Sequence, residues 1–344
     1  MKIFINKKFK FNPCNLFVFA EGESAPQKSS DSDIAGEFKT YYNERLIRKA
    51  KPNLVYTQFA VTSPLPAGKG KVVEFRGFCE LDTDVKNRKL VEGETPPPQK
   101  LKMYTVLAEI EQYGGYIPLN DIIETTAIDN TVNAAIDVLS GQAYVVLDKL
   151  ARNAIISDDE VHECFAKGVE ADAELTVEGH KITVDDIRTI VNILKRNNAP
   201  RINGAYPLVL HTDVATDLTA DEEYKSLYRY LKPEKLANGY VGDIAGARIY
   251  ETTNALITQN SNGVAVYHCT LIGQGSYGTV KLEGNALRTI IKQLGSSGSS
   301  DPLDQRGSAG WKAATANKVL IPKYIVNFCC TAKFNGVDDA EASV

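Results

Sequence analysis

The sequence predicts an α+β fold in which one long helix lies along a sheet. Apolar residues recur at three- and four-residue steps from Val132 to Ala154, which is the period of a helix with a single apolar face. Two runs rich in β-branched and aromatic residues, at 72–78 and 101–110, enclose a charged stretch and indicate a long two-stranded hairpin. The chain has no internal repeat, so we expect an irregular mixture of helices and strands.

Composition and charge exclude several classes of protein. The 344 residues are 43% hydrophobic and 24% charged, which are ordinary globular proportions, and this length favours about two domains. With 39 Lys and Arg against 43 Asp and Glu, the net charge is −4, which disfavours a protein that binds nucleic acid through its phosphates. Apolar runs such as Leu16–Ala20 fall far short of the about 20 residues that a membrane-spanning helix needs.

Cysteine usage indicates a reducing compartment. No two of the six cysteines have the C-x-x-C spacing of a zinc or redox site, and they are scattered over the whole chain. We expect six reduced, mostly buried thiols in a cytosolic chain, with a disulfide-bonded secreted protein as the alternative. The cysteines are Cys14, Cys79, Cys164, Cys269, Cys329 and Cys330.

The N-terminal residues predict an extended arm. Lysines precede Leu16–Ala20, but this apolar run is too short for a secretory signal, and we expect a flexible segment instead. Residues 21–33 are polar and small and predict a linker, because they cannot bury enough apolar surface to fold. Helical spacing over 36–50 ends at Lys51-Pro52, since proline pushes the preceding residue out of the helical region.

The predicted hairpin follows a turn at 64–68 and has a long polar tip. Its strands at 72–78 and 101–110 are joined by the charged residues 82–100, which include Pro96-Pro97-Pro98. An isolated hairpin is marginally stable in water, so we expect this one to lie against another surface. That expectation is the first indication of an assembly.

The remaining elements are expected in a defined order along the chain. Tyr113–Pro118 predicts a corner, and the long helix then covers about 131–156 with a length of roughly 38 Å. A capping box at Thr183 to Asp186 begins a second helix, which Pro200 terminates. Also expected are a small hairpin near 175–177, strands at 206–210, 247–251 and 264–272, a short helix at 221–231, a flexible loop at 295–300, and closing apolar segments at 313–321 and 324–331.

A glycine-rich segment from Gly273 to Val280 fits the G-x-G-x-x-G-x-V pattern of a kinase phosphate loop. A kinase loop opens a large catalytic domain, but only a short C-terminal segment follows here, and the chain has no H-R-D or D-F-G triplet. A dinucleotide-binding fold would need a helix after the glycines, whereas Thr279–Leu282 continues as a strand. We interpret the segment as a turn between strands, with a nucleotide-using enzyme as the alternative.

The sequence predicts no catalytic, cofactor or metal site, so we do not expect an enzyme. His211 and Asp213 could supply two metal ligands, but no third lies near them in sequence, and we expect Asp213 to cap a short helix. Asp158–Cys164 concentrates possible ligands without the H-E-x-x-H spacing, which favours a solvated acidic surface. His180 stands alone, and His268 lies in an apolar strand, where a hydrogen-bonded core imidazole is expected.

A series of short motifs from about Tyr41 to Thr331 points to one family. They include Tyr42-Asn43-Glu44-Arg45-Leu46, Gln58-Phe59-Ala60, Glu92-Gly93-Glu94-Thr95-Pro96, Gln112-Tyr113-Gly114, Lys195-Arg196-Asn197-Asn198-Ala199-Pro200 and His211-Thr212-Asp213-Val214-Ala215. The most specific stretch contains Asp301-Pro302-Leu303-Asp304-Gln305-Arg306 and Gly310-Trp311-Lys312-Ala313. In this order the motifs resemble the major capsid proteins of tailed bacteriophages, in the N-four-like family.

The resemblance implies the HK-ninety-seven-like phage capsid fold. Such a subunit has an N-terminal arm, a long hairpin called the E-loop, a peripheral domain with a spine helix, and an axial domain. The chain would divide into the arm at 1–60, the E-loop hairpin at 61–112, the peripheral domain with its spine helix at 113–200, the axial domain at 201–290, and a return to the peripheral domain with a C-terminal tail at 291–344.

The resemblance also implies a structural function. The chain would be a major capsid protein, made in the bacterial host cytoplasm, that self-assembles into hexamers and pentamers of an icosahedral virion shell around double-stranded DNA. A bacterial encapsulin-like compartment shell is the alternative. Expected partners are further copies of the chain, portal, scaffold or decoration proteins, and weakly held packaged DNA, with no membrane and no cofactor. Inter-subunit contacts are expected at Phe75, Arg76, Glu92, Gln305, Arg306 and Trp311.

Overall fold

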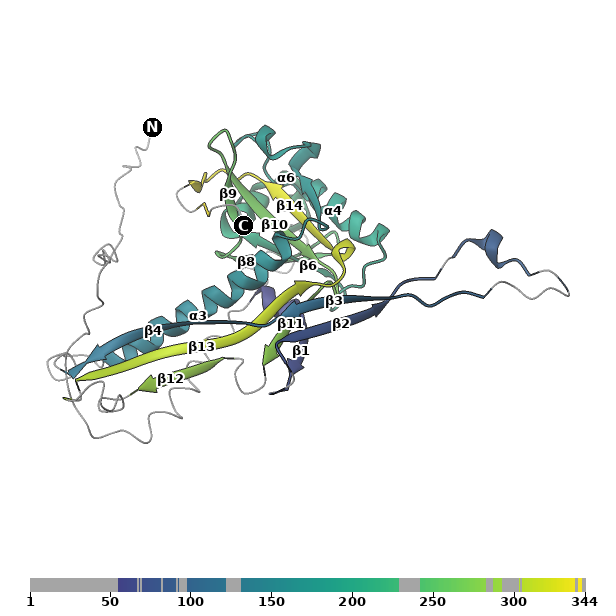
Figure 1. The fold of residues 1–344 in the computed structure, drawn as a ribbon. Coiled ribbons are helices and arrows are strands. Elements are labelled where there is room, and N and C mark those ends of the chain that lie inside the picture. Colours follow the sequence, from purple (N-terminus) through teal and green to yellow (C-terminus); the bar gives the residue numbers. More distant parts are fainter. Residues whose placement is uncertain are drawn as a thin grey trace, which may run out of the picture.

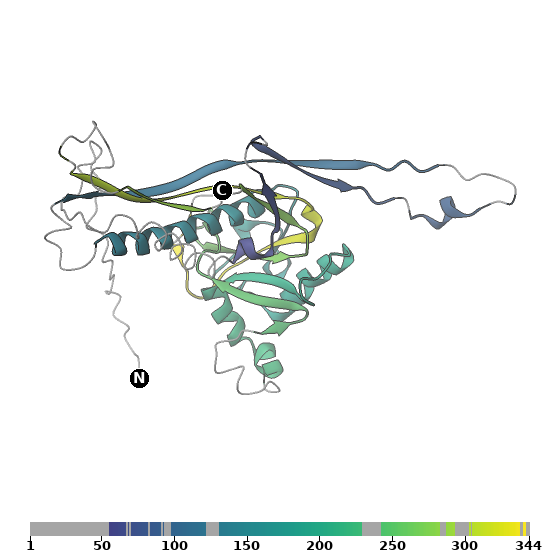
Figure 2. The ribbon, with the colours of Figure 1, turned by 90° about the horizontal axis from the view of Figure 1, so that it is seen from below.

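The structure, a computed structural model, is an elongated molecule with a hairpin that projects beyond its body (Figures 1 and 2). Among the described residues the strands form two larger sheets and this two-stranded hairpin. We call them the spine sheet (β1, β4, β11, β12, β13), the second sheet (β5 to β10, β14) and the projecting hairpin (β2, β3). The described residues are 55–66, 68, 70–81, 83–90, 92, 98–121, 131–228, 242–282, 287–292, 303, 305–337 and 340–341.

The spine sheet is built around β13, which is 14 residues long and can therefore pair with several strands. Strand β4 pairs with it antiparallel along one edge, and β12 and β11 pair antiparallel in succession along the other. Strand β1 extends the sheet by pairing parallel with β11. The bounds are β1 Val61–Leu65, β4 Glu111–Asn120, β11 Tyr277–Leu282, β12 Arg288–Lys292 and β13 Arg306–Val319.

The predicted long helix is confirmed as α3, Thr131–Ile156, which lies along one face of the spine sheet (Figures 1 and 2). Its apolar stripe, including Ile136 and Leu139, packs on Ala309 and Trp311 of β13. Burial of a side chain such as isoleucine or leucine contributes about 1.5–3 kcal/mol. Contact with the sheet therefore explains how a helix with only one apolar face extends over so many turns.

The prediction of a corner at Tyr113–Pro118 is wrong, because these residues lie inside β4. Glycine and proline suggested a turn, but here glycine allows a close approach between strands. A Cβ on Gly114 would lie 2.6 Å from the carbonyl oxygen of Trp311 on β13. Pro118 is tolerated because, among the described residues, β4 pairs only with β13 and so forms an edge of the sheet.

The second sheet has the strand order β5-β14-β10-β6-β8-β7, and β9 pairs with β10 beside this path. Helices α4 and α5 contribute to the core on one of its faces, with Ile187, Leu194 and Leu218 packed near Leu271 and Phe328. The strands are β5 His162–Phe165, β6 Tyr206–His211, β7 Asp243–Ile244, β8 Ala247–Thr252, β9 Ile257–Gln259, β10 Ala265–Ile272 and β14 Ile325–Cys330. The helices are α4 Val184–Arg196, α5 Thr212–Ala220 and α6 Glu222–Tyr228, with short 3-10 turns at Ala166–Gly168, Asp172–Glu174 and Pro322–Tyr324.

Several elements of this unit confirm the predictions. The Thr183 hydroxyl accepts a hydrogen bond from the Asp186 amide, while the Asp186 carboxylate accepts one from the Thr183 amide, so the capping box begins α4. The strands predicted at 206–210, 247–251 and 264–272 are β6, β8 and β10. The helix predicted at 221–231 is described as α6.

The predicted hairpin near 175–177 is wrong. The nearby segment His162–Phe165 does form a strand, but it pairs parallel with β14, far along the chain. Leu175 is fully buried beside Val266 and Cys329. A long-range pairing and a core contact therefore replace the local pairing that the short apolar run suggested.

The chain crosses from the second sheet to the spine sheet at the glycine-rich segment. Strand β10 ends at Ile272, β11 begins at Tyr277, and Gly275 has a φ of 76° in the turn between them, as predicted. Strands β11 and β12 belong to the spine sheet. Strands β5 and β14 belong to the second sheet, and α4 packs in the core of that sheet. The two sheets therefore do not follow the expected domain ranges, which have boundaries at residues 200 and 290.

The projecting hairpin is confirmed as β2, Val72–Phe78, paired antiparallel with β3, Met103–Glu109. Its base packs on the spine sheet, where Phe75 and Ala108 lie in one cluster with Val280 and Ala316. Further out, the hairpin carries a short 3-10 turn at Val85–Arg88. Only the base therefore shares a core with the body.

Some predictions lie outside the described residues. These are most of the N-terminal arm, including the helix expected at 36–50, and the loop expected at 295–300. Another 3-10 turn, at Tyr56–Phe59, begins the part of the chain that the structure describes. Within that part, no helix combines the length and the apolar character needed to cross a membrane.

Two glycine-to-alanine substitutions should have opposite effects on stability. Gly114→Ala would place a Cβ against the backbone of β13, so we expect it to lower the free energy of unfolding by about 1–3 kcal/mol. Gly141→Ala would add a Cβ with no atom within 4 Å on α3, so it should raise the free energy of unfolding by about 0.5–1 kcal/mol. Urea unfolding of both variants tests this, and equal effects would contradict the close approach of β4 to β13.

Candidate functional site: an exposed hairpin and a buried polar junction

The predicted contact residues do not gather into one site. Arg76 and Glu92 are exposed on the hairpin, and Phe75 is half-buried at its base, near Gly278. Gln305 and Arg306 are exposed where β13 begins, at the end of the spine sheet that is far from the hairpin (Figure 1). One subunit therefore presents these residues in two separate regions.

Trp311 differs from the other predicted contact residues because its side chain lies in the core. It is 3% exposed, packs beneath α3, and donates a hydrogen bond from Nε1 to Gln142 Oε1 at 2.9 Å. Its indole therefore holds α3 on the spine sheet, and a contact of Trp311 with a neighbouring molecule stays a prediction.

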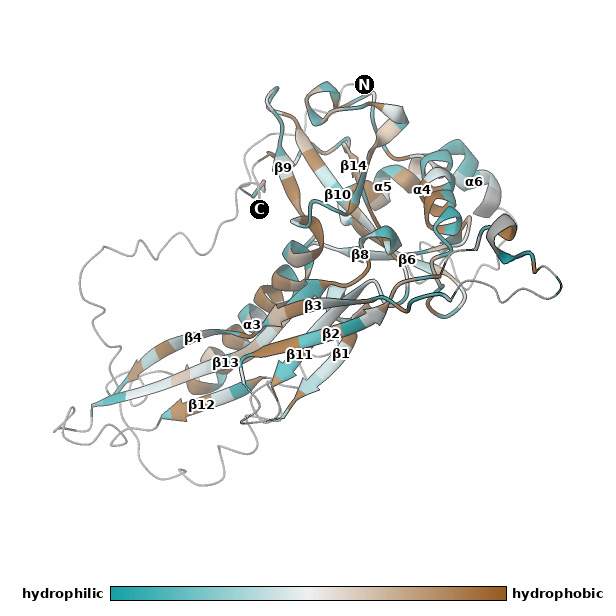
Figure 3. Cartoon of the chain, turned by 45° about the vertical axis from the view of Figure 1, so that its right-hand side comes forward, coloured by the Kyte–Doolittle hydropathy of each residue, from teal (hydrophilic) through white to brown (hydrophobic). Residues whose placement is uncertain are grey.

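The outward face of the hairpin carries exposed apolar side chains beside the Arg76–Glu74 ion pair. Phe78 is 65% exposed, Leu107 is 63% exposed and Met103 is 54% exposed, and Phe78 lies directly opposite Met103 in the strand register. Leu101 and Val85 extend the apolar surface toward the tip. Figure 3 colours parts of β2 and β3 as hydrophobic although they project from the body. Exposed apolar side chains that lie together on a projection are typical of interaction surfaces.

A shallow groove lies on the spine sheet. It is lined by β4 residues from Gln112 to Tyr116 and by residues of β12 and β13. Tyr116 is 71% exposed and Ile290 is 41% exposed, while Lys292 and Lys312 add positive charge. The groove thus combines apolar side chains with two lysines.

A buried junction joins the two sheets. Ala151 and Ile155 from the second half of α3 pack in one cluster with Tyr56, with Ile272 of the second sheet and with Tyr277 of the spine sheet. The Tyr277 hydroxyl donates a hydrogen bond to the carbonyl of Tyr56. The segment that leads out of the N-terminal region is therefore held between the helix and both sheets.

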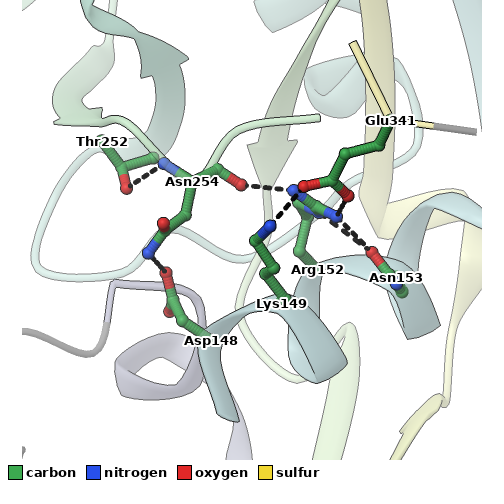
Figure 4. Close-up of polar contacts among 7 residues, drawn as sticks. All are labelled: Asp148, Lys149, Arg152, Asn153, Thr252, Asn254 and Glu341. Atoms are coloured by element: carbon green, nitrogen blue, oxygen red, sulfur yellow. Dashed lines mark hydrogen bonds and ion pairs between the residues drawn. The ribbon is translucent and has the colours of Figure 1, made fainter. Parts of the chain in front are cut away.

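Asp148 holds this segment from the helix side. It is fully buried, and its Oδ1 accepts hydrogen bonds from the backbone amides of Val55 at 3.0 Å and Tyr56 at 2.9 Å. Its Oδ2 accepts a hydrogen bond from Asn254 Nδ2 at 3.3 Å, as Figure 4 shows. One carboxylate on α3 therefore links the start of the described chain to the loop between β8 and β9.

Arg152, one turn further along α3, is also fully buried, and each of its guanidinium nitrogens donates a hydrogen bond. Its guanidinium donates to Asn153 Oδ1, to the carbonyl of Asn254 at 2.7 Å and to Glu341 Oε2 at 2.5 Å (Figure 4). Lys149 makes a second ion pair with Glu341. These contacts fix the C-terminal segment to the spine helix.

The charges of the junction compensate one another. Burial raises the pKa of Asp148, although the amides of Tyr56 and Val55, Asn254 and the charge of Arg152 oppose this rise. Burial also raises the pKa of Glu341, but the hydrogen bonds and charges of Arg152 and Lys149 outweigh it and hold that pKa below its ordinary value. Two acids and two bases thus balance, which suits a structural joint that fixes two units relative to each other.

The other sequence candidates have structural partners. His211, rather than Asp213, caps α5 by accepting a hydrogen bond from the Asp213 amide, while Tyr267 donates to the Asp213 carboxylate. The two residues thus belong to the helix cap and the core. His268 is 9% exposed and lies 2.9 Å from Thr258 Oγ1, and burial with the charge of Arg152 lowers its pKa to about 4. It is therefore the hydrogen-bonded core imidazole that the sequence predicted.

The free cysteines among the described residues are Cys79, Cys164, Cys269, Cys329 and Cys330.

Sequence reasoning missed the junction residues Asp148 and Arg152. Their spacing of four residues places them on one side of a helix, and two opposite charges so spaced inside an apolar stripe were the available signal. Their partners Val55, Asn254 and Glu341 lie so far away in sequence that no local pattern identifies them.

Comparison with solved structures identifies the fold. The chain is 12% identical to the capsid protein in "Cyanophage Pam1 capsid asymmetric unit", with a TM-score of 0.62 over 93% of this chain and 99% of that one. The chain is 12% identical to "Capsid of Ralstonia phage GP4", with a TM-score of 0.62 over 92% of this chain and 98% of that one. It is 14% identical to "Capsid structure of the Cyanophage P-SCSP1u", with a TM-score of 0.59 over 93% of this chain and 94% of that one. No protein-family model and no curated protein matches the sequence. The chain therefore has the HK-ninety-seven-like fold of these phage capsid structures, as the resemblance implied.

Removal of the Asp148 carboxylate should loosen the junction. We expect Asp148→Ala to lower the free energy of unfolding by about 2 kcal/mol or more, because buried donors left without a partner cost about 1–3 kcal/mol each. Asp148→Asn keeps one acceptor oxygen and should have a smaller effect. Hydrogen exchange at the Tyr56 amide and urea unfolding measure this, with the exposed Asp159→Ala as the control, expected within about 0.5 kcal/mol of the wild type. An unchanged Tyr56 exchange rate in Asp148→Ala would refute the anchoring role.

The Glu341 ion pairs should make stability depend on pH in the acid range. Because folding lowers the pKa of Glu341 from its ordinary 4.5, the contribution of this group is present above pH 4.5 and is lost as the pH falls through the folded-state pKa. The stability difference between wild type and Glu341→Gln should therefore be largest near pH 7 and shrink below pH 4.5. Unfolding curves across this range test it, and a difference independent of pH would contradict the ion pairs.

Proposed function

We propose that the chain is a major capsid protein of a tailed bacteriophage, which self-assembles into hexamers and pentamers of an icosahedral shell. One observation carries this proposal beyond the fold. The hairpin exposes large apolar side chains that the described part of the chain does not cover, including Phe78, Met103 and Leu107. A surface of this kind needs a partner, and in a shell every subunit meets identical neighbours.

The energetics favour burial of the hairpin by another molecule. Complete burial of a phenylalanine, leucine or methionine side chain contributes about 1.5–3 kcal/mol. A two-stranded hairpin is marginally stable by itself, so contact with a neighbour would also stabilise its strands. Closed symmetric assemblies repeat such a contact at every subunit without leaving a free edge, whereas an open arrangement would extend into a filament.

We infer that the groove on the spine sheet receives the hairpin of a neighbouring copy. The groove offers Tyr116 and Ile290 as exposed apolar side chains, with Lys292 and Lys312 beside them. The hairpin offers exposed apolar residues such as Phe78 and Leu107, beside the ion pairs Lys71–Glu109 and Arg76–Glu74. Hydrophobic contact at the centre with polar groups around it is the usual arrangement of a specific interface.

In this proposal the two sheets correspond to the two domains of the capsid fold. The spine sheet with α3 would be the peripheral domain, and the second sheet with α4 and α5 would be the axial domain, around which subunits of a capsomer meet. The predicted contacts at Arg76, Glu92, Gln305 and Arg306 would then lie at opposite ends of the subunit, as contacts to different neighbours require. Phe75 would support the hairpin at its base.

The proposal includes weak contact with packaged DNA and none with a membrane. The net charge of −4 suits a container that must not hold its DNA tightly, and any contact with phosphates should weaken with added salt. Portal, scaffold or decoration proteins would be further partners of the virion shell, and synthesis would take place in the host cytoplasm. The subunit would act through repeated contacts and perform no catalysis.

Assembly of the purified full chain tests this function. We expect capsomers or closed shells in negative-stain micrographs, either from the chain alone or together with a scaffold protein. A chain that stays monomeric in sedimentation experiments across protein and salt concentrations, with and without scaffold, would refute the proposal. Native particles should contain double-stranded DNA, whereas an enzyme cargo would favour the compartment shell.

Substitutions on the hairpin should separate assembly from folding. Phe78→Glu places a charge on the exposed apolar face, so we expect it to abolish shells while the unfolding transition of the monomer is unchanged. Phe78→Leu keeps the apolar character and should still assemble. Tyr116→Glu in the groove should reproduce the defect of Phe78→Glu, and normal assembly of both charged variants would disprove this interface.

A further inference from the structure

A cluster of potential metal ligands lies on the second sheet, apart from the hairpin and the groove. It consists of Glu163 on β5, His268 on β10, and Cys329 on β14, the strand between them. Glu163 pairs with Asn327 in the register of β5 and β14, and His268 pairs with Cys329 in the register of β10 and β14. Because paired residues share one face of a sheet, the strand ladder itself brings the three side chains together.

The distances within the cluster are those of a compact ligand set. Cys329 Sγ lies 3.2 Å from Glu163 Oε1 and 3.3 Å from His268 Nδ1. The three ligand atoms all lie within 4.8 Å of one another. In a tetrahedral zinc site with bonds of about 2.0–2.3 Å, neighbouring ligand atoms are about 3.3–3.7 Å apart. The side chains thus need only small movements to surround an ion.

We propose that Glu163, His268 and Cys329 bind one divalent transition-metal ion, of which Zn²⁺ is the best fit. Thiolate and imidazole ligands select zinc over the harder magnesium and calcium ions, and a mixed set of sulfur, nitrogen and oxygen donors is typical of zinc. One thiolate and one carboxylate would offset the two positive charges of the ion, so the site would be buried without net charge. Glu163 is exposed and opens a path for the ion from solvent.

The surroundings of the cluster support this assignment. Thr258 Oγ1 lies 2.9 Å from His268 Nε2, so it can accept the N–H of that nitrogen and leave Nδ1 as the ligand atom. Asn327 is 4% exposed, and its Nδ2 lies 3.1 Å from His268 Nδ1, 3.3 Å from Glu163 Oε1 and 3.8 Å from Cys329 Sγ. Its Oδ1 has no partner among the described residues. Rotation of this amide would turn the unpaired oxygen toward the ion as a fourth ligand.

Two nearby charges have opposite effects on the binding of a cation at this site. Asp172 interacts electrostatically with Glu163, and its buried Oδ1 is also without a partner in the described part of the chain. This second acid favours a cation. Arg152 acts on His268 from the other side and opposes a cation, but its charge is paired with Glu341.

Metal binding would tie together strands that are distant in sequence. The ion would replace the thiol proton of Cys329, so one proton leaves for each ion bound, and it would replace the direct contacts among the three side chains. It would link β5, a strand of four residues at the edge of the second sheet, to β10 across β14. We therefore expect the ion to stabilise the folded unit, because it binds the assembled strands and not the unfolded chain.

Cobalt titration of the full chain, freed of metal with a chelator, tests the site. We expect one Co²⁺ per subunit, with the visible bands of a tetrahedral site and a near-ultraviolet band from sulfur-to-cobalt charge transfer. Cys329→Ser should lose the charge-transfer band. Cys164→Ser, on the neighbouring strand β5 but outside the cluster, should keep it. Thr258→Val should keep the band and weaken the cobalt affinity by about 10–100-fold, since it removes only the orienting contact to His268.

A second readout covers variants that fail to fold. Glu163→Gln changes an exposed side chain, so it should fold normally and weaken cobalt binding, and zinc should raise the Tm of the wild type but not of this variant. Absence of cobalt binding by the wild type, a charge-transfer band that survives in Cys329→Ser, or unchanged affinity in Glu163→Gln would each overturn the proposal. All these measurements are independent of shell assembly.

Discussion

The buried junction on the second half of α3 is the constraint on which the rest of the subunit depends. A helix and two sheets meet there, and the charged side chains buried between them need partners, since an unpaired buried group costs about 1–3 kcal/mol. Asp148 and Arg152 satisfy this requirement by binding backbone groups near residue 55, the loop at Asn254 and the carboxylate of Glu341. Because these partners come from both ends and the middle of the described chain, one helix turn fixes the relative position of the two units. Polar geometry of this kind permits one arrangement, whereas apolar packing alone tolerates several.

A rigid body determines where the exposed surfaces of the hairpin and the groove lie. The hairpin shares a core with the spine sheet only at its base, and its outward side chains, such as Phe78, remain uncovered in one subunit. If the body were loose, the hairpin and the groove could not meet the corresponding parts of neighbouring copies at repeatable angles. In the proposed assembly, the junction would set the geometry through internal polar contacts, and the hairpin would supply free energy through apolar contacts with a neighbour.

The second sheet likewise combines an apolar core with a buried polar cluster. Its helix-covered face is apolar, with Leu271 and Phe328 in the main core, while the opposite face carries His268, Asn327 and Cys329. Polar side chains in such a position either form a closed hydrogen-bond network or bind an ion, and the unpaired oxygen of Asn327 shows that the network is not closed within the described residues. The proposed metal would complete it, joining a short edge strand to the centre of the sheet.

The sequence by itself determined the elements whose signals are local. The period of α3, the capping box at Thr183 and the hairpin strands depend on residues within one or two turns of each other, so they could be predicted, and the family motifs pointed to the fold. The tertiary structure decided what pairs with what. Gly114 lies in a strand because β13 approaches its backbone, His162–Phe165 pairs with β14 rather than locally, and Trp311 lies in the core beneath α3. The partners of Asp148 and Arg152, and the meeting of Glu163, His268 and Cys329, arise from strand order and register. These depend on contacts between residues that lie far apart in the chain, and no local spacing encodes such contacts.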